Sequence, residues 1–177
     1  CASMGWDLPA AIGASIASKK NRTICITGDG SIMLNLQELQ TIVHHKLPIK
    51  VFVINNDGYH SIRQSQANYY NGKEIGCGPS SGISFPNFKK VFESFGIKSY
   101  QINSLKNLEK NIDVVLKNPG PTLTEVIVDK NQLFEPRLAS KKLKNGQIVS
   151  PPLEDMAPFL DREEFLSNMI IKPWKDE

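Results

Sequence analysis

Two short polar segments contain the residue types that bind a metal ion and a phosphorylated ligand: Thr27-Gly28-Asp29-Gly30-Ser31 and Asn55-Asn56-Asp57-Gly58. Asp29 offers a hard carboxylate oxygen, and Asn56 offers a hard amide oxygen. Magnesium takes oxygen ligands and is usually held by one or two carboxylates together with substrate phosphates and water. Ser31 and the amides just before the following helix are suited to bind phosphate oxygens, assisted by the helix dipole. These residues therefore indicate a magnesium-bridged diphosphate site.

The flanking elements are expected to bring the two segments together. Residues 22–27 and 49–54 are short apolar, β-branched runs that predict buried strands, and residues 35–44 carry apolar side chains at helical spacing. Strand, loop, helix, strand and loop form a βαβ unit, whose polar loops lie at the edge where open parallel sheets bind ligands. Glycines in both loops allow the backbone to approach a ligand closely: Gly28, Gly30 and Gly58.

Either polar segment alone is more typical of a simple turn than of a metal site, because Gly-Asp-Gly and Asn-Asn-Asp-Gly are common turn sequences. Their placement after two strands of one βαβ unit favours a binding site. No lysine follows Gly28-Asp29-Gly30, which excludes a P-loop, and no Gly-x-Gly-x-x-Gly dinucleotide fingerprint is present. A magnesium phosphohydrolase would need a second carboxylate near Asp29, and Asp57 is the candidate.

The spacing from Gly28-Asp29-Gly30 to Asn55-Asn56 resembles the signature of thiamine diphosphate enzymes. The segment from Ser3 to Ala14 is similar to the Met-Gly-x-Gly-Leu-Pro-Ala-Ala-Ile-Gly-Ala segment of the acetolactate synthase branch. Gln37-Glu38-Leu39 and Leu47-Pro48-Ile49 also match that branch. The resemblance covers residues 1–130 and is weak in the last quarter of the chain.

The resemblance implies a role for each matching residue. Asp29 and Asn56 would bind Mg²⁺ through their side chains, and Gly58 through its carbonyl. Met4 would lie beside the aminopyrimidine and hold the cofactor bent, with backbone groups of Ala2 and Met4 bonding the ring nitrogens. Further contacts, mostly along the diphosphate, would come from Gly28, Gly30, Ser31, Tyr59 and His60. The resemblance assigns no catalytic residue to this chain.

Several positions depart from the family pattern or leave two interpretations open. Ser65 stands where acetolactate synthases carry the tryptophan that selects the acceptor 2-ketoacid, so decarboxylation or lysis of another acyl donor competes with acetolactate formation. Asp7 replaces the usual glycine and is either a helix cap or a carboxylate that faces the substrate. Arg63 and Gln64 would either hold a substrate carboxylate or lie at the surface.

The composition is that of one ordinary globular domain of 177 residues, with 40% hydrophobic and 22% charged residues. A net charge of +3 gives no indication of nucleic acid or membrane binding. The odd set Cys1, Cys25 and Cys77 lacks metal-ligand spacing, which indicates a reduced, cytoplasmic protein. No apolar run reaches membrane-spanning length, and no signal peptide is visible.

The remaining pattern predicts an α/β fold: a doubly wound parallel sheet with helices on both faces, followed by an extended C-terminal tail. We expect a cofactor-binding domain over residues 1–130 and a tail with a short helix over residues 131–177. A glycine-rich loop over residues 71–86 is a candidate active-site cover, with Cys77 exposed in it. Further helices are expected over residues 8–18, 59–70, 85–95, 105–116 and 161–170, and further strands over 97–102 and 122–128.

The sequence thus predicts the diphosphate-binding and magnesium-binding domain of a thiamine diphosphate-dependent 2-ketoacid enzyme similar to acetolactate synthase. In this family a glutamate from another domain activates the cofactor, so we expect these residues to be an inactive fragment, or a split subunit, of a dimeric or tetrameric enzyme. The alternative is a non-catalytic cofactor-binding or scaffold subunit that retains the fold.

Overall fold

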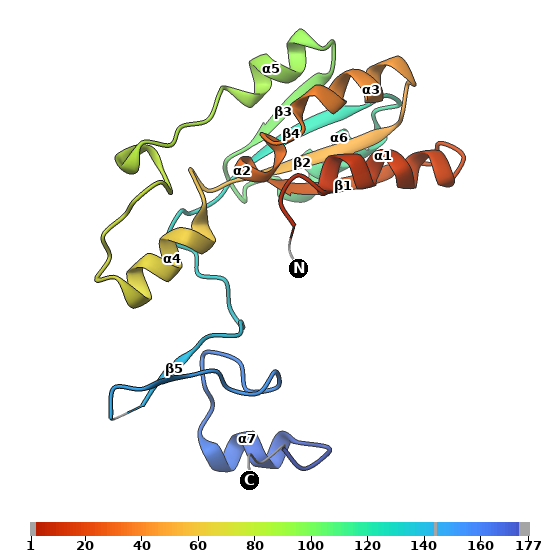
Figure 1. Ribbon diagram of the computed structural model, residues 1–177. Coiled ribbons are helices and arrows are strands. Elements are labelled where there is room, and N and C mark those ends of the chain that lie inside the picture. The colour runs from red at the N-terminus through yellow and green to blue at the C-terminus, as the bar shows by residue number, and fades with distance from the viewer. Residues whose placement is uncertain (1–2, 144, 174–177) are drawn as a thin grey trace. The chain divides into compact units, whose positions relative to one another are not determined.

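The structure is a computed structural model and describes residues 3–143 and 145–173 (Figure 1). The chain divides into two compact units, Cys1–Gln132 and Leu133–Glu177. We describe each unit by itself, because the candidate site lies within the first.

The first unit is built on a parallel sheet, which has four strands among the described residues. Its strands are β1 (Thr23–Gly28), β2 (Ile49–Asn55), β3 (Lys98–Ile102) and β4 (Thr122–Ile127). Their spatial order is β1-β2-β4-β3, and every neighbouring pair is parallel. Gly28 pairs with Ile54, so β1 and β2 end side by side. The predicted α/β fold with a parallel sheet is confirmed.

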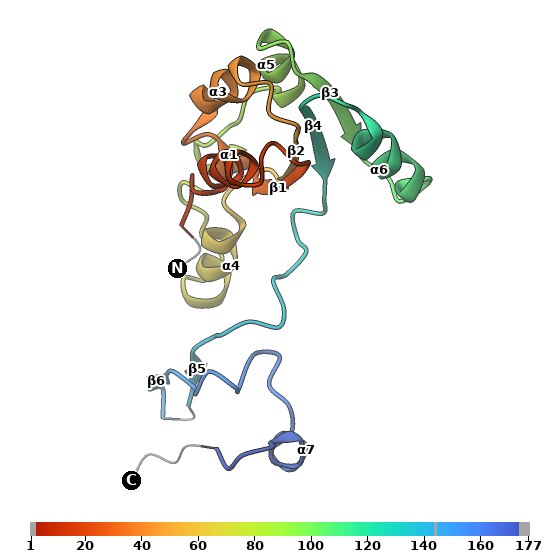
Figure 2. The same ribbon diagram turned by 90° about the vertical axis from the view of Figure 1, so that its right-hand side faces the viewer.

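Helices cover both faces of this sheet. Figure 2 shows α6 (Leu108–Lys117) on the face opposite α1 (Asp7–Ala17) and α3 (Leu39–His44). The main core lies between the sheet and the helices α1, α3 and α5 (Phe88–Ser94). In β2 the alternate residues Ile49, Val51 and Val53 face this core, and Val51 pairs with Cys25 of β1 and Leu123 of β4. The members of the core include Leu8, Ile12, Cys25, Leu39, Ile42, Val51, Val53, Phe88, Phe92 and Leu123.

The segment between β1 and β2 differs from the single helix expected over residues 35–44. It begins with the short helix α2 (Asp29–Ile32), continues through the 3-10 turn η1 (Leu36–Glu38) and ends in α3. Asn35 interrupts the helical path, because its backbone lies at φ −140° and its side-chain amide donates to the Gly5 carbonyl at 2.5 Å. This bond joins the loop before α1 to the segment that follows Asp29.

Two helical elements follow β2 on the way to α5. They are α4 (His60–Tyr69) and the 3-10 turn η2 (Pro79–Ser81) within the glycine-rich loop. The helix expected over residues 85–95 begins only at Phe88, where the Asn87 side chain accepts from the Lys90 amide at 2.9 Å. The helix expected over residues 105–116 begins only at Leu108, after Asn107 in a left-handed conformation.

The second unit contains more structure than an extended tail. Strands β5 (Lys141–Lys142) and β6 (Ile148–Val149) form a small antiparallel pair, and Arg137 bridges to Ala157. Helix α7 (Arg162–Asn168) is capped by Asp161, whose side chain accepts from the Glu163 amide at 2.9 Å. Among the described residues of both units, no helix is long and apolar enough to cross a membrane.

Two titratable side chains of the sheet, Cys25 and Lys50, are buried, and burial shifts the pKa of each. Burial, with a smaller contribution from Asp7, raises the pKa of the Cys25 thiol to about 12, so this cysteine stays protonated. Lys50 of β2 is only 1% exposed, and its ammonium donates to the carbonyls of Asn118, at 2.5 Å, and Gly120. Burial lowers the pKa of Lys50, and the two carbonyls compensate the buried charge. These hydrogen bonds from Lys50 therefore stabilise the turn at residues 118–120, which leads into β4.

Replacing Lys50 by methionine should lower the free energy of unfolding by about 2 kcal/mol, because the turn carbonyls lose hydrogen bonds to a charged donor. Chemical denaturation followed by circular dichroism measures this change. Lys110→Met is the matched control, since Lys110 is exposed on α6, and its effect should stay within about 0.5 kcal/mol. Equal stability of the two variants would show that the buried ammonium contributes nothing to the fold.

Candidate cofactor and metal site

The predicted metal residues lie together where β1 and β2 end. Gly28 is the last residue of β1 and Asp29 is the first of α2, while Asn56 directly follows β2. The Asn56 amide donates to Asp29 Oδ2 at 3.1 Å. The two polar segments that the sequence singled out therefore form one site at the carboxyl edge of the sheet, although 27 positions separate Asp29 from Asn56.

Asp29 organises the loop after β2 from a buried position. Its side chain is 2% exposed. Oδ2 accepts from the amides of Asn56 and Gly58, both at 3.1 Å, and Oδ1 accepts from the Gly30 amide at 2.7 Å. Burial raises the pKa of Asp29 above its usual value even though these amide donors favour the carboxylate. A cation bound at this carboxylate would place a positive charge beside it and so stabilise its ionised form.

Asn56 holds an oxygen that suits such a cation. Its Oδ1 is buried and has no hydrogen-bond partner among the described residues. A buried oxygen left unpaired is costly, and a hard divalent cation is one group that removes the cost. The described residues contain no cluster of three or more His, Cys, Asp or Glu side chains for a metal. A metal here would therefore complete its coordination with phosphate and water, as Mg²⁺ commonly does.

Close packing explains two of the three glycines. A Cβ on Gly30 would lie 2.2 Å from Cε1 of Tyr59, so the Tyr59 ring rests against the Gly30 backbone. Gly58 has φ +142°, and a Cβ there would lie 2.0 Å from the Cys77 carbonyl oxygen. The Tyr59 amide donates to that same oxygen at 2.8 Å. At Gly28, in contrast, no described atom lies within 4 Å of the Cβ position, which leaves room for a ligand.

The glycine-rich loop thus packs directly against the loop after β2. Cys77 is fully buried, so the expectation that it is exposed is wrong. Both backbone groups of Cys77 form hydrogen bonds within the fold. Its carbonyl accepts from the Tyr59 amide, and its amide donates to Ser81 Oγ at 3.0 Å.

Asp7 joins helix α1 to the phosphate-binding candidate Ser31. Asp7 Oδ2 accepts from Ser31 Oγ at 2.5 Å and from Thr27 Oγ1 at 2.6 Å, while Oδ1 accepts from the Leu8 amide at 2.8 Å. Ser31 Oγ in turn accepts from the Gly5 amide at 2.9 Å. Asp7 is the first residue of α1 rather than the residue before it, and its carboxylate faces site residues.

Comparison with known proteins identifies the family of this chain. The family described as "Thiamine pyrophosphate enzyme, C-terminal TPP binding domain" matches residues 1–126. The chain belongs to this family of thiamine pyrophosphate enzymes. It is 40% identical to the acetolactate synthase large subunit of Porphyra purpurea over 146 residues, 82% of this chain and 24% of that protein. Its identity to the acetolactate synthase isozyme 1 large subunit of Escherichia coli is 31% over 133 residues, 75% of this chain and 23% of that protein.

The resemblance to the acetolactate synthase branch of the thiamine pyrophosphate enzymes is thereby confirmed. The match to the large subunit of Buchnera aphidicola extends over 174 residues, 96% of this chain, at 33% identity. It therefore includes the C-terminal unit, where the sequence resemblance was weak. The chain spans about a quarter of the length of these curated relatives.

Two further residues expected at a thiamine pyrophosphate site, Met4 and His60, are chain neighbours of residues at this edge, Gly5 and Tyr59. Met4 is 47% exposed, and its neighbour Gly5 contacts Ser31. His60 is 5% exposed at the start of α4. The expected backbone contact from Ala2 lies outside the described residues. Ser65 is small, and its hydroxyl donates to the Ser61 carbonyl at 2.9 Å.

Arg63 has a function that the sequence did not reveal. Its guanidinium donates to the carbonyls of Asn56, at 3.3 Å, and Asp57, at 2.8 Å. It is therefore neither a surface charge nor an open holder of a substrate carboxylate. The carbonyls that it binds are backbone atoms, which leave no trace in the sequence. The position of the arginine one turn into the next helix was the available signal.

Replacing Gly30 by alanine should destabilise the fold by about 1–3 kcal/mol, because the new methyl group overlaps the Tyr59 ring, which also contacts Phe85 at 5.8 Å between ring centroids. Thermal and chemical unfolding measure the loss. In a double-mutant cycle with Tyr59→Ala the overlap disappears, so the penalty of Gly30→Ala should shrink.

Gly13→Ala in α1 is the control for this glycine substitution. No described atom lies within 4 Å of its Cβ position, so alanine should stabilise the helix by roughly 0.5–1 kcal/mol. If Gly30→Ala were as well tolerated as Gly13→Ala, the close contact between Gly30 and Tyr59 would be refuted.

Proposed function

We propose that this chain binds Mg²⁺ and the diphosphate of thiamine diphosphate within a 2-ketoacid enzyme similar to acetolactate synthase. Asp29 and Asn56 contribute side-chain oxygens to the metal, and Gly58 contributes its carbonyl. The observation that carries the proposal is the Oδ1 of Asn56, which is buried and has no hydrogen-bond partner among the described residues. Asp29 holds the loop that contains it, because the amides of Asn56 and Gly58 donate to the Asp29 carboxylate. Such a loop presents a fixed oxygen ligand without further rearrangement.

The cofactor would lie along the same edge of the sheet. Gly28 supports this placement because the space at its Cβ position is empty. The proposal assigns the diphosphate to backbone and side-chain groups of Gly28, Gly30, Ser31, Tyr59 and His60. Ala2 and Met4 take the ring end, where Met4 offers a half-exposed apolar side chain.

The proposed reaction begins with a 2-ketoacid. Thiamine diphosphate, when bound, would supply the nucleophilic carbon that attacks the keto carbon and would take up the electron pair left when carbon dioxide departs. The residues of this chain bind and orient the cofactor, and no acid or base is assigned to them, because in this family a glutamate from another domain activates the cofactor. A dimer or tetramer of the complete protein and inactivity of residues 1–177 alone are parts of the same proposal.

A second candidate reaction is favoured by Ser65. Acetolactate synthases place a large tryptophan at this position to select the acceptor, whereas Ser65 is small and its hydroxyl bonds within its own helix. A decarboxylase or a lyase that uses another acyl donor fits this helix at least as well as carboligation to acetolactate. Screening of 2-ketoacids for carbon dioxide release and for carboligation products separates the two candidates.

The central test is calorimetry of thiamine diphosphate with Mg²⁺ on the complete protein and on two variants. Asp29→Ala should weaken binding by at least the roughly 100-fold that loss of an outer-shell metal partner can cost. Asn56→Ala should also weaken binding, yet it should change the unfolding free energy by less than about 1 kcal/mol, because its Oδ1 has no partner to lose among the described residues.

Asp113→Ala is the matched control, since Asp113 is an exposed carboxylate on α6 paired with Lys117 at 3.0 Å. Its binding should equal that of the parent protein. Magnesium-independent binding, or equal binding by Asp29→Ala and Asp113→Ala, would refute the metal assignment. Mass spectrometry of the recovered cofactor separates binding from phosphohydrolysis, because a phosphohydrolase would release phosphate from it.

A further inference from the structure

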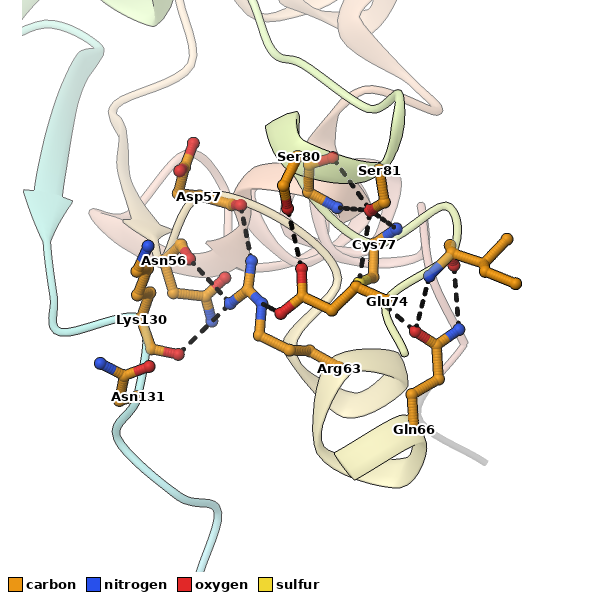
Figure 3. A network of polar contacts seen from close by, with 12 residues as sticks. Asn56, Asp57, Arg63, Gln66, Glu74, Cys77, Ser80, Ser81, Lys130 and Asn131 are labelled. Carbon is orange, nitrogen blue, oxygen red and sulfur yellow. Dashed lines mark hydrogen bonds and ion pairs between the residues drawn. The ribbon is translucent and has the colours of Figure 1, made fainter. Parts of the chain in front are cut away.

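The guanidinium of Arg63 connects three segments around the proposed metal loop, residues 56–58 (Figure 3). Nη1 donates to the carbonyls of Asn56 and Lys130, both at 3.3 Å, and Nη2 donates to the Asp57 carbonyl at 2.8 Å. Nε lies 3.7 Å from Glu74 Oε1, and the Arg63 side chain is only 12% exposed. Each nitrogen thus faces an oxygen acceptor.

Two glycines make room for this planar group. A Cβ on Gly58 would lie 2.8 Å from Arg63 Nη2, and a Cβ on Gly78 would lie 2.9 Å from the same atom. The guanidinium therefore rests between the metal loop and the glycine-rich loop. Glu74 completes the contact between the two loops, because its other carboxylate oxygen accepts from Ser80 Oγ at 2.9 Å.

The metal loop is held from two sides as a result. Its amides donate to side-chain oxygens: those of Asn56 and Gly58 donate to Asp29, and that of Asp57 donates to Asn55 Oδ1 at 3.0 Å. Its carbonyls at 56 and 57 accept from Arg63. Asp57 has φ +61°, a left-handed conformation that a non-glycine residue rarely adopts. The contacts on both sides maintain this conformation.

We infer that Arg63 is a positioning residue that fixes the ligand geometry of the metal loop before the metal binds. The inference rests on the proposed function, because the metal is the ligand of that loop. Arg63 acts through the carbonyls of Asn56 and Asp57 and touches no reacting atom. Lysine cannot replace it, since one ammonium on a flexible stem lacks the rigid fork that reaches several carbonyls at once.

The test compares two metals in the complete protein. Mg²⁺ requires near-ideal octahedral geometry, whereas Ca²⁺ accepts flexible geometry and longer bonds. Thiamine diphosphate affinity is measured by calorimetry, once with Mg²⁺ and once with Ca²⁺. Arg63→Met should lose roughly 10- to 100-fold in Mg²⁺-supported affinity, the usual effect of removing an outer-shell partner. The loss with Ca²⁺ should be smaller, so the preference for Mg²⁺ falls.

Two further variants complete the design. Arg22→Met is the matched control, because exposed Arg22 donates to a single backbone carbonyl, that of Leu116 at 3.3 Å, and both affinities should stay at the parent values. Arg63→Lys keeps the charge and should resemble Arg63→Met; it also serves if the methionine variant does not fold.

Three results would overturn the inference. One is unchanged Mg²⁺-supported affinity in Arg63→Lys, and another is an equal loss with both metals, which indicates general damage to the fold. The third is a parent protein that binds thiamine diphosphate with neither metal. That result refutes the proposed function itself, whereas the first two leave it standing.

Discussion

The backbone of one short loop, residues 56–58, determines the arrangement of the rest of the site. A loop of this kind is stable only if its polar groups are paired, since buried amides and carbonyls are costly when unsatisfied. The protein pairs the amides with Asp29 and Asn55 and the carbonyls of Asn56 and Asp57 with Arg63. The side chain of Asn56 then keeps an oxygen that none of the described residues binds.

The glycines of the site follow from this constraint as much as from a ligand. Gly58 has to pass close to the Cys77 carbonyl and the Arg63 guanidinium, and Gly30 has to accommodate the Tyr59 ring. A side chain at either position would displace a group that holds the metal loop. Gly28 differs, because the space at its Cβ position is empty, so internal packing does not require a glycine there.

The sequence was sufficient to predict the sheet and the meeting of Asp29 with Asn56, because strand runs and parallel topology depend on apolar patterns that are visible in one dimension. It was insufficient for contacts made to backbone oxygens. Lys50 donates to a turn carbonyl 68 positions away, and Arg63 donates to carbonyls of the loop just before its own helix. In both cases the direction of the carbonyl depends on the backbone conformation and not on a side-chain type. Cys77 was misjudged for the same reason, since its burial depends on a carbonyl that accepts from Tyr59. Side-chain types indicate chemistry, but backbone acceptors appear only in three dimensions.

The charges at this edge also bear on how a diphosphate would bind. Asp29 is buried and bonded to the metal loop. The carboxylate of Asp7 lies beside Ser31 and accepts a hydrogen bond from its hydroxyl. A diphosphate near Ser31 would therefore meet negative charge, and like charges at short range repel strongly in a poorly solvated site. The N–H groups of Arg63 already face the carbonyls of Asn56 and Asp57 and the carboxylate of Glu74. In the proposed site a bound cation would offset this repulsion, and the hydrogen bonds of Asp29 and Arg63 to the metal loop would hold the oxygen of Asn56 in place for it.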